Sequence, residues 1–127
     1  GAGYYNYNNG IKEDDPLIHQ LIIQASNEKG IERKVFNEDE IINRILLTIA
    51  NEAALLLSEG VTTRMNDIDL VMVNGFGFPK WKGGPAYWAS RQELNYLYKQ
   101  QEILEKSTGL GFIKGDLSIF NKLAKTA

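Results

Sequence analysis

Hydrophobic residues recur every three or four positions over most of this chain, which is the spacing of helices with one buried face. The clearest pattern begins at Asn37, where Glu40 follows at the spacing of a capping box, and it ends at Gly60. Asn51 and Glu52 interrupt its apolar stripe, so a helix in the core would need polar partners or an exposed edge for them. The stripe consists of Ile41, Ile42, Ile45, Leu46, Ile49, Ala53, Leu56 and Leu57.

Weaker patterns of the same kind predict four more helices. One starts near Pro16 and is ended by Gly30, one is capped by Asn66 and stopped by Gly75, and one covers residues 92–106. A last short helix uses Asp116 as its cap, with Leu117, Phe120 and Leu123 facing inward. We expect no strands, because no segment alternates between apolar and polar residues for long enough. The predicted fold is all-α with about five packed helices in one domain over residues 1–127, preceded by an extended arm or tight turns at 1–10.

A shaped loop interrupts the helices at residues 74–88, where 15 residues hold four glycines, two prolines and five aromatic residues. Glycine permits backbone conformations that other residues resist, and proline fixes φ. We expect the aromatic residues to supply the burial that keeps this loop ordered. Trp88 and Tyr87 are expected to open the next helical turn. The interface or structural residues of the loop are Gly75, Gly77, Phe78, Pro79, Trp81, Gly83, Gly84 and Pro85.

The composition is typical of a soluble globular domain. With 127 residues, 43% hydrophobic residues and a net charge of −2, the chain has the balance of one soluble globular domain. Zero cysteines, no signal pattern and no apolar run longer than Ala53 to Leu57 favour the cytoplasm and argue against membrane insertion. A sequence pI of 5.4 argues against nucleic acid as a partner.

Candidate chemistry is sparse. Residues 75–80 superficially match a dinucleotide fingerprint, but they follow a predicted helix and not a strand. His19 is the single histidine and has no neighbour at metal-ligand spacing, so we expect a surface residue, no metal site and no catalytic residue. Lys80 and Lys82, beside Gly83-Gly84, form a weak candidate site for a phosphate.

Ordered motifs between residues 37 and 90 resemble the C-terminal helical domain of the 3-hydroxyacyl-CoA dehydrogenase family. They are the Asn43-Arg44 pair, Asn51-Glu52-Ala53, Asp67-Ile68-Asp69 and the glycine-rich loop. The loop most resembles the second of two tandem helical copies in the fatty-acid β-oxidation multienzyme, and residues 1–7 resemble the segment that links the copies. The resemblance covers about 90 residues and is weak beyond Gln92.

The resemblance implies a helical fold like the C-terminal domain of 6-phosphogluconate dehydrogenase. It implies a parent oxidoreductase of fatty-acid metabolism, in which a crotonase-like part hydrates 2-enoyl-CoA and a Rossmann part oxidises the product with NAD. The catalytic histidine and glutamate of the family lie in the Rossmann part, so this chain would bind no cofactor itself and would be inactive alone. Its partners would be the Rossmann domain and the first helical copy, and it would shape the acyl-CoA pocket indirectly. Asn43 matches an asparagine that lies near the substrate in the first copy.

Two other interpretations remain open from the sequence. The chain could be a free-standing helical adaptor that docks its aromatic loop on a partner, or a small-molecule domain in which Lys80 and Lys82 bind a CoA phosphate. An exposed apolar face would also make a homodimer plausible.

Overall fold

The first of two compact units contains a β-hairpin that the sequence patterns did not predict. The computed structural model of the chain describes residues 3–108 and 111–124, and its units are Gly1–Phe36 and Asn37–Ala127. Strands β1 (Tyr5–Asn8) and β2 (Ile11–Asp14) pair antiparallel, from Tyr5 opposite Asp14 to Asn8 opposite Ile11. Asn9 and Gly10 form the two-residue turn with φ of 51° and 81°, which matches the twist of paired strands. The expectation of no strands is therefore wrong here.

Helix α1 (Pro16–Glu28) follows the hairpin and confirms the predicted start at Pro16. The Asp15 side chain caps it by accepting a hydrogen bond from the Leu17 N–H at 2.9 Å. None of its residues is buried, and its exposed apolar residues include Leu17, Leu21, Ile22 and Ile23.

The second unit is built on α2 (Glu38–Ser58), the long helix that the sequence predicts. Its capping box is present, with the Glu40 N–H donating to Asn37 Oδ1 and the Asn37 N–H donating to Glu40 Oε2, both at 2.9 Å. Further elements of this unit are α3 (Met65–Gly75), the 3₁₀ turn η1 (Lys80–Lys82), α4 (Pro85–Ser90), α5 (Leu94–Thr108) and α6 (Ser118–Ala124).

The all-α class is confirmed, although the described residues contain six α-helices and not about five. The additional one is α4, for which the sequence indicated only an opening turn at Tyr87 and Trp88. Helix α3 begins at Met65 and receives no side-chain cap, so the predicted capping role of Asn66 is wrong.

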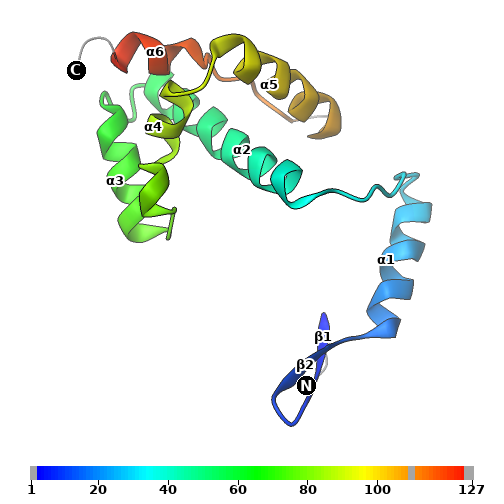
Figure 1. Cartoon of the computed structure of the whole chain (residues 1–127). Helices are drawn as coiled ribbons and strands as arrows, with labels where there is room; N and C mark the ends of the chain where they lie inside the picture. The colour runs from blue at the N-terminus through cyan, green and yellow to red at the C-terminus, as the bar shows by residue number, and fades with distance from the viewer. Residues whose placement is uncertain (1–2, 109–110, 125–127) are drawn as a thin grey trace. The chain divides into compact units, whose positions relative to one another are not determined.

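Helices α3, α4, α5 and α6 all pack on α2, mainly along its C-terminal two-thirds (Figure 1). Alanines allow the backbones of α2 and α4 to approach closely, and Ala50, Ala54, Ala86 and Ala89 have no exposed surface. Leu97, Leu117 and Phe120 complete the centre, which confirms the inward faces predicted for α6. The first turns of α2 contribute nothing to this core, because its buried residues begin at Leu46.

By length and composition, α2 is the helix among the described residues that could cross a membrane. That signal is weak, because the core helix of a globular unit passes the same test. Here α2 carries the core of the second unit and is contacted by four other helices.

A buried amide pair joins α2, α5 and the segment before α6. Asn51 Oδ1 accepts hydrogen bonds from Gln101 Nε2 at 2.7 Å and from the Gly115 N–H at 2.9 Å. Asn51 Nδ2 donates to the Ile113 carbonyl oxygen at 2.8 Å, and Gln101 Nε2 also donates to the Gly115 carbonyl at 2.9 Å. Gly115 is needed for this approach, since a Cβ there would lie 2.8 Å from the Asn51 carbonyl oxygen. The polar partners that the sequence demanded for Asn51 are thus present.

Asp116 stabilises the start of α6 from the exposed side. Its Oδ1 accepts hydrogen bonds from the Ser118 N–H at 2.9 Å and the Tyr98 hydroxyl at 3.2 Å, and its Oδ2 lies 3.2 Å from Lys122 Nζ. Hydrogen bonds from Ser118, with smaller contributions from Lys122 and Tyr98, lower the pKa of Asp116 to about 2. The predicted capping role of Asp116 is confirmed.

We predict that Asn51→Ala lowers the free energy of unfolding by about 3 kcal/mol, because it leaves the buried Gly115 N–H without its acceptor and removes the hydrogen bonds to Gln101 Nε2 and the Ile113 carbonyl oxygen. Asn43→Ala is the matched control on the same helix and should cost less than about 1 kcal/mol, since Asn43 is only half-buried. Urea denaturation followed by circular dichroism measures both. Equal losses in the two variants would contradict the role given to Asn51.

We also predict a pH dependence that Asp116 produces. A folded-state pKa of about 2 lies below the ordinary 3.8, so the ionised carboxylate favours the folded state. This stabilisation is complete above about pH 5 and is lost as the pH falls toward about 2. Between those limits the unfolding free energy of the wild type should fall more steeply than that of Asp116→Asn, which cannot ionise. Parallel curves for the two proteins would show that Asp116 contributes nothing.

Candidate functional site

The loop at residues 74–88 is held in place by a carboxylate from a different helix. Helix α4 begins after Gly84, which has no side chain to cap it. Asp69 on α3 supplies the missing acceptor, taking hydrogen bonds from the Ala86 N–H at 2.8 Å and the Tyr87 N–H at 3.0 Å. Asp69 thereby satisfies two otherwise unpaired N–H groups of α4 and ties α4 to α3.

The environment of Asp69 decides what else this helix end can bind. The Asp69 side chain is buried, and burial raises its pKa, while the hydrogen bonds from Ala86 and Tyr87 oppose that rise. The Gly83 N–H donates to the Lys80 carbonyl oxygen at 3.1 Å. The N–H groups of Gly83, Ala86 and Tyr87 are therefore already paired and are not available to a phosphate, which weakens the phosphate hypothesis.

Two of the four predicted loop glycines are required by close contacts. Gly84 has φ of 116°, and a Cβ there would lie 2.3 Å from Asp69 Oδ1. Gly83 has φ of 78°, and a Cβ there would lie 2.5 Å from Cδ1 of Tyr87. Gly77 has φ of 71° but open space around it, and Gly75 ends α3 with neither constraint.

Each of the two loop prolines lies at the start of a short helical element. Pro79 precedes η1, and Pro85 is buried in the first turn of α4, where its missing N–H costs nothing. The Phe78 N–H, next to Pro79, donates to the Met72 carbonyl oxygen at 3.0 Å and fastens the loop to the end of α3.

The aromatic residues differ from expectation. Phe78 is 6% exposed and Trp88 packs partly against the core, but Phe76 is 75%, Trp81 84% and Tyr87 52% exposed. The loop is ordered by the Asp69 cap, the Phe78 hydrogen bond and the buried Pro85, so the other aromatic residues are free to face solvent. The prediction that the aromatic residues bury the loop is wrong for these three.

A hollow of about 370 Å³ lies beside the loop, between α3 and the start of α4. Its walls are mainly apolar, with Lys80 as the cation. It is lined by Asn66, Asp69, Leu70, Val73, Lys80, Gly83 and Tyr87.

Asn43, the other candidate from the sequence, does not belong to this site. It lies half-buried on α2, before the first buried residue of that helix, and it does not line the hollow. Its neighbour Arg44 donates a hydrogen bond to Ser107 Oγ at 2.6 Å, which links α2 to the end of α5.

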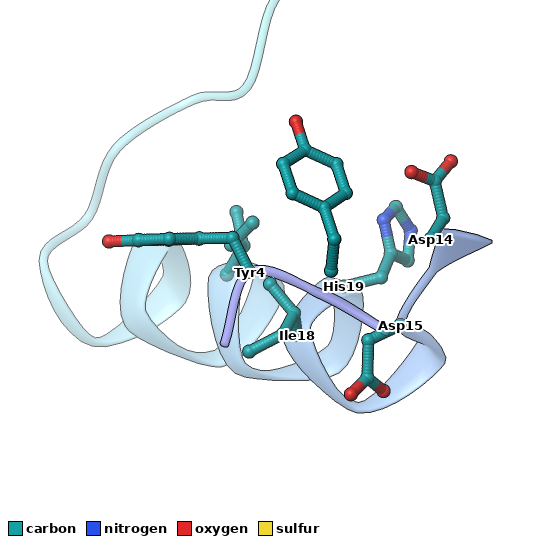
Figure 2. Close-up of a pocket in the computed structure, with 7 residues that line it drawn as sticks. Tyr4, Asp14, Asp15, Ile18 and His19 are labelled. Atoms are coloured by element: carbon teal, nitrogen blue, oxygen red, sulfur yellow. The ribbon is translucent and has the colours of Figure 1, made fainter. Parts of the chain in front are cut away.

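The first unit contains a separate pocket of about 460 Å³ between its hairpin and α1. In Figure 2 the side chains of Asp14 and His19 lie on the same side of this pocket, while Tyr4 and Ile18 form its apolar part. His19 is exposed, as the sequence predicts for a surface histidine. In the part of the chain that the structure describes, no group of three His, Cys, Asp or Glu side chains that could hold a metal is found.

Residues 41–126 match the family described as 3-hydroxyacyl-CoA dehydrogenase, C-terminal domain. This chain belongs to that family. The match extends to residue 126, well past Gln92, where the motifs become hard to follow. It covers α2 from Ile41 onward and every later helix of the second unit.

Named relatives are much longer than the chain. The peroxisomal bifunctional enzyme of Pongo abelii is 36% identical over 93 residues, which cover 71% of this chain and 13% of that protein. The human peroxisomal bifunctional enzyme is 34% identical over 93 residues, with the same coverage of both chains. The glyoxysomal fatty acid beta-oxidation multifunctional protein MFP-a of Cucumis sativus is 32% identical over 117 residues, which cover 88% of this chain and 16% of that protein. That last alignment is long enough to include part of the first unit.

The names of these relatives bear on the expected location. They are peroxisomal or glyoxysomal enzymes, so they support a soluble enzyme domain but not the cytoplasm.

The two carboxylates of Asp67-Ile68-Asp69 have different roles. Asp67 acts within the first turn of α3, where it pairs with Arg64. Asp69 points across to α4, 17 residues later. A glycine at the N-cap of a following helix is the feature that indicates a cap from elsewhere.

We predict a ranked effect of loop substitutions on stability. Gly84→Val should lower the free energy of unfolding by at least about 3 kcal/mol, because the new side chain collides with Asp69. Gly77→Val should cost about 1–2 kcal/mol through its positive φ alone, and Lys80→Ala less than about 0.5 kcal/mol. Thermal unfolding of the three variants tests the order. Similar stabilities would mean that backbone geometry is not what holds the loop.

Proposed function

We propose that the chain is the second of two tandem helical domains in a multifunctional enzyme of fatty-acid β-oxidation. The other parts of that enzyme would hydrate 2-enoyl-CoA and oxidise 3-hydroxyacyl-CoA with NAD. The names of the relatives, bifunctional and multifunctional, support this proposal, as does the fact that the chain spans 13% to 16% of their length.

In this proposal the domain works by packing and not by chemistry. It binds no NAD itself, it is inactive alone, and it helps to shape the acyl-CoA pocket by supporting the first helical copy and the Rossmann domain. Asn43 is our candidate for a residue near the substrate, and the glycine-rich loop is our candidate for a structural contact. A site preorganised by a supporting domain loses precision when that support is removed.

The exposed first turns of α2 are the observation that carries the proposal. Ile41, Ile42 and Ile45 are 46%, 45% and 54% exposed, although α2 is the core helix of its unit. They lie within one and a quarter turns of each other, so they form an apolar surface that a neighbouring domain would cover. Glu38, Asp39 and Glu40 place negative charge at its edge.

The same surface would also serve a homodimer or a free-standing adaptor, and these are the alternatives that the experiment must separate. The peroxisomal and glyoxysomal names of the relatives weigh against the cytoplasm that the sequence suggested, and the location of a full-length tagged protein relative to a peroxisomal marker decides the compartment.

We predict that the human peroxisomal bifunctional enzyme still oxidises 3-hydroxyacyl-CoA with NAD when its matching segment is replaced by residues 37–127 of this chain to give a chimera. Ile45→Glu in the chimera should lower this activity at least tenfold, because it places a charge in the proposed domain contact. Val61→Glu is the matched control, since Val61 is 68% exposed and lies outside α2. The isolated chain should show no turnover with NADH and acetoacetyl-CoA.

Turnover by the isolated chain would overturn the claim that it is inactive alone. If the chimera is active and Ile45→Glu has no more effect on its activity than Val61→Glu, the first turns of α2 do not form the proposed domain contact. An inactive chimera, together with an isolated chain that forms an Ile45-dependent dimer in sedimentation, would favour the adaptor.

A further inference from the structure

The surface around η1 has a charge opposite to that of the chain as a whole. Residues 70–92 contain Lys80, Lys82 and Arg91 and no aspartate or glutamate, although the net charge of the chain is −2. The two carboxylates that precede this segment are engaged, since Asp67 pairs with Arg64 and Asp69 binds the start of α4. The positive charge here is therefore not neutralised from within the segment.

Exposed aromatic side chains accompany these lysines. Trp81 lies between Lys80 and Lys82 and is 84% exposed, Phe76 at the end of α3 is 75% exposed, and Tyr87 on α4 is 52% exposed. We name these five residues, Phe76, Lys80, Trp81, Lys82 and Tyr87, the basic aromatic corner. In Figure 1 the end of α3 and the start of α4 lie together at one end of the second unit.

The corner continues into an apolar surface of α3. Lys80 and Tyr87 line the same hollow as Leu70 and Val73, and Leu70 is 60% exposed. Asp69 joins α3 to α4, so the backbone positions that carry Leu70, Val73 and Tyr87 are held together. Trp81 is exposed and outside the core, and it adds a large aromatic ring to this surface.

We propose that the basic aromatic corner docks on the surface of an anionic phospholipid bilayer. Tryptophan and tyrosine favour the boundary between headgroups and acyl chains, where the ring is buried and its polar atom stays wet. Lysines beside them are attracted by the negative potential of anionic lipids. This docking is a surface association and needs no inserted helix.

Charge distinguishes this surface from the other exposed apolar face of the second unit. The first turns of α2 combine aliphatic side chains with Glu38, Asp39 and Glu40, which an anionic bilayer would repel. Aliphatic residues edged by carboxylates suit a protein neighbour, whereas aromatic residues edged by lysines suit anionic lipid. The corner shares no residue with the proposed domain contact at Ile41, Ile42 and Ile45 of α2.

Cosedimentation of the full chain with vesicles tests the proposal. Vesicles of phosphatidylcholine with about 30% phosphatidylglycerol should bind the chain at least tenfold more strongly than pure phosphatidylcholine, and raising the salt from about 0.1 to 0.5 M should weaken binding. Lys80→Gln with Lys82→Gln should weaken binding roughly 25-fold, about fivefold for each lysine. Trp81→Ala should weaken it at least fivefold, and it should abolish a vesicle-induced blue shift of tryptophan fluorescence.

Matched controls keep the test specific. Lys99→Gln with Lys106→Gln removes the same charge from exposed positions on α5, and Val61→Ala removes an exposed apolar side chain elsewhere. Both controls should bind within twofold of the wild type. All substituted side chains are exposed except that of Lys82, which is half-buried, and thermal unfolding checks that each variant is folded.

Failure of the wild type to bind anionic vesicles would overturn the proposal, as would corner variants that bind like the controls. If vesicles have no effect while Trp81→Ala abolishes self-association in sedimentation, the corner is a protein interface and the lipid assignment is wrong.

Discussion

The carboxylate of Asp69 accepts hydrogen bonds from the start of α4, and most features of the second unit's exposed end depend on that contact. Helix α4 is only six residues long and has glycine at its N-cap, so it cannot satisfy its own first N–H groups. By reaching across from α3, Asp69 sets the direction of α4, brings Gly84 within contact distance and fixes the loop between the helices. With the backbone held this way, the loop does not need Phe76, Trp81 or Tyr87 for burial.

The second unit exposes two different apolar surfaces, one at the first turns of α2 and one at the loop before α4. The core draws on α2 only from Leu46 onward and uses small alanines against α4, so the first turns of α2 extend past it with their isoleucines exposed. The loop is held by backbone hydrogen bonds, so Phe76 and Trp81 are exposed as well. One surface has an acidic edge and the other a basic one, which is why we assign them to different partners.

Much of the helical framework was predictable from local rules. Asn37 with Glu40, Pro16 after Asp15, and Asp116 before Ser118 are start signals whose partners lie within a few residues, and the structure confirms each of them. The hairpin was also a local feature, because the Asn9-Gly10 turn was visible, but four-residue strands are too short for alternation to be recognised. The candidate site was harder to predict. Phe78 and Trp81 are both aromatic residues in one loop, yet one is buried and the other is exposed.

The sequence by itself determined where the longer helices form, which face of α2 and α6 is apolar, and to which family the chain is related. Periodicity, capping and the order of motifs depend on residues that are neighbours along the chain. The tertiary structure decided that Asn51 pairs with Gln101, 50 residues away, that Asp69 caps α4, and which aromatic side chains remain in solvent. These outcomes depend on how far apart two helices lie once the core is packed. Distances of that kind follow from the sum of all side-chain contacts and not from the spacing of residues along the chain.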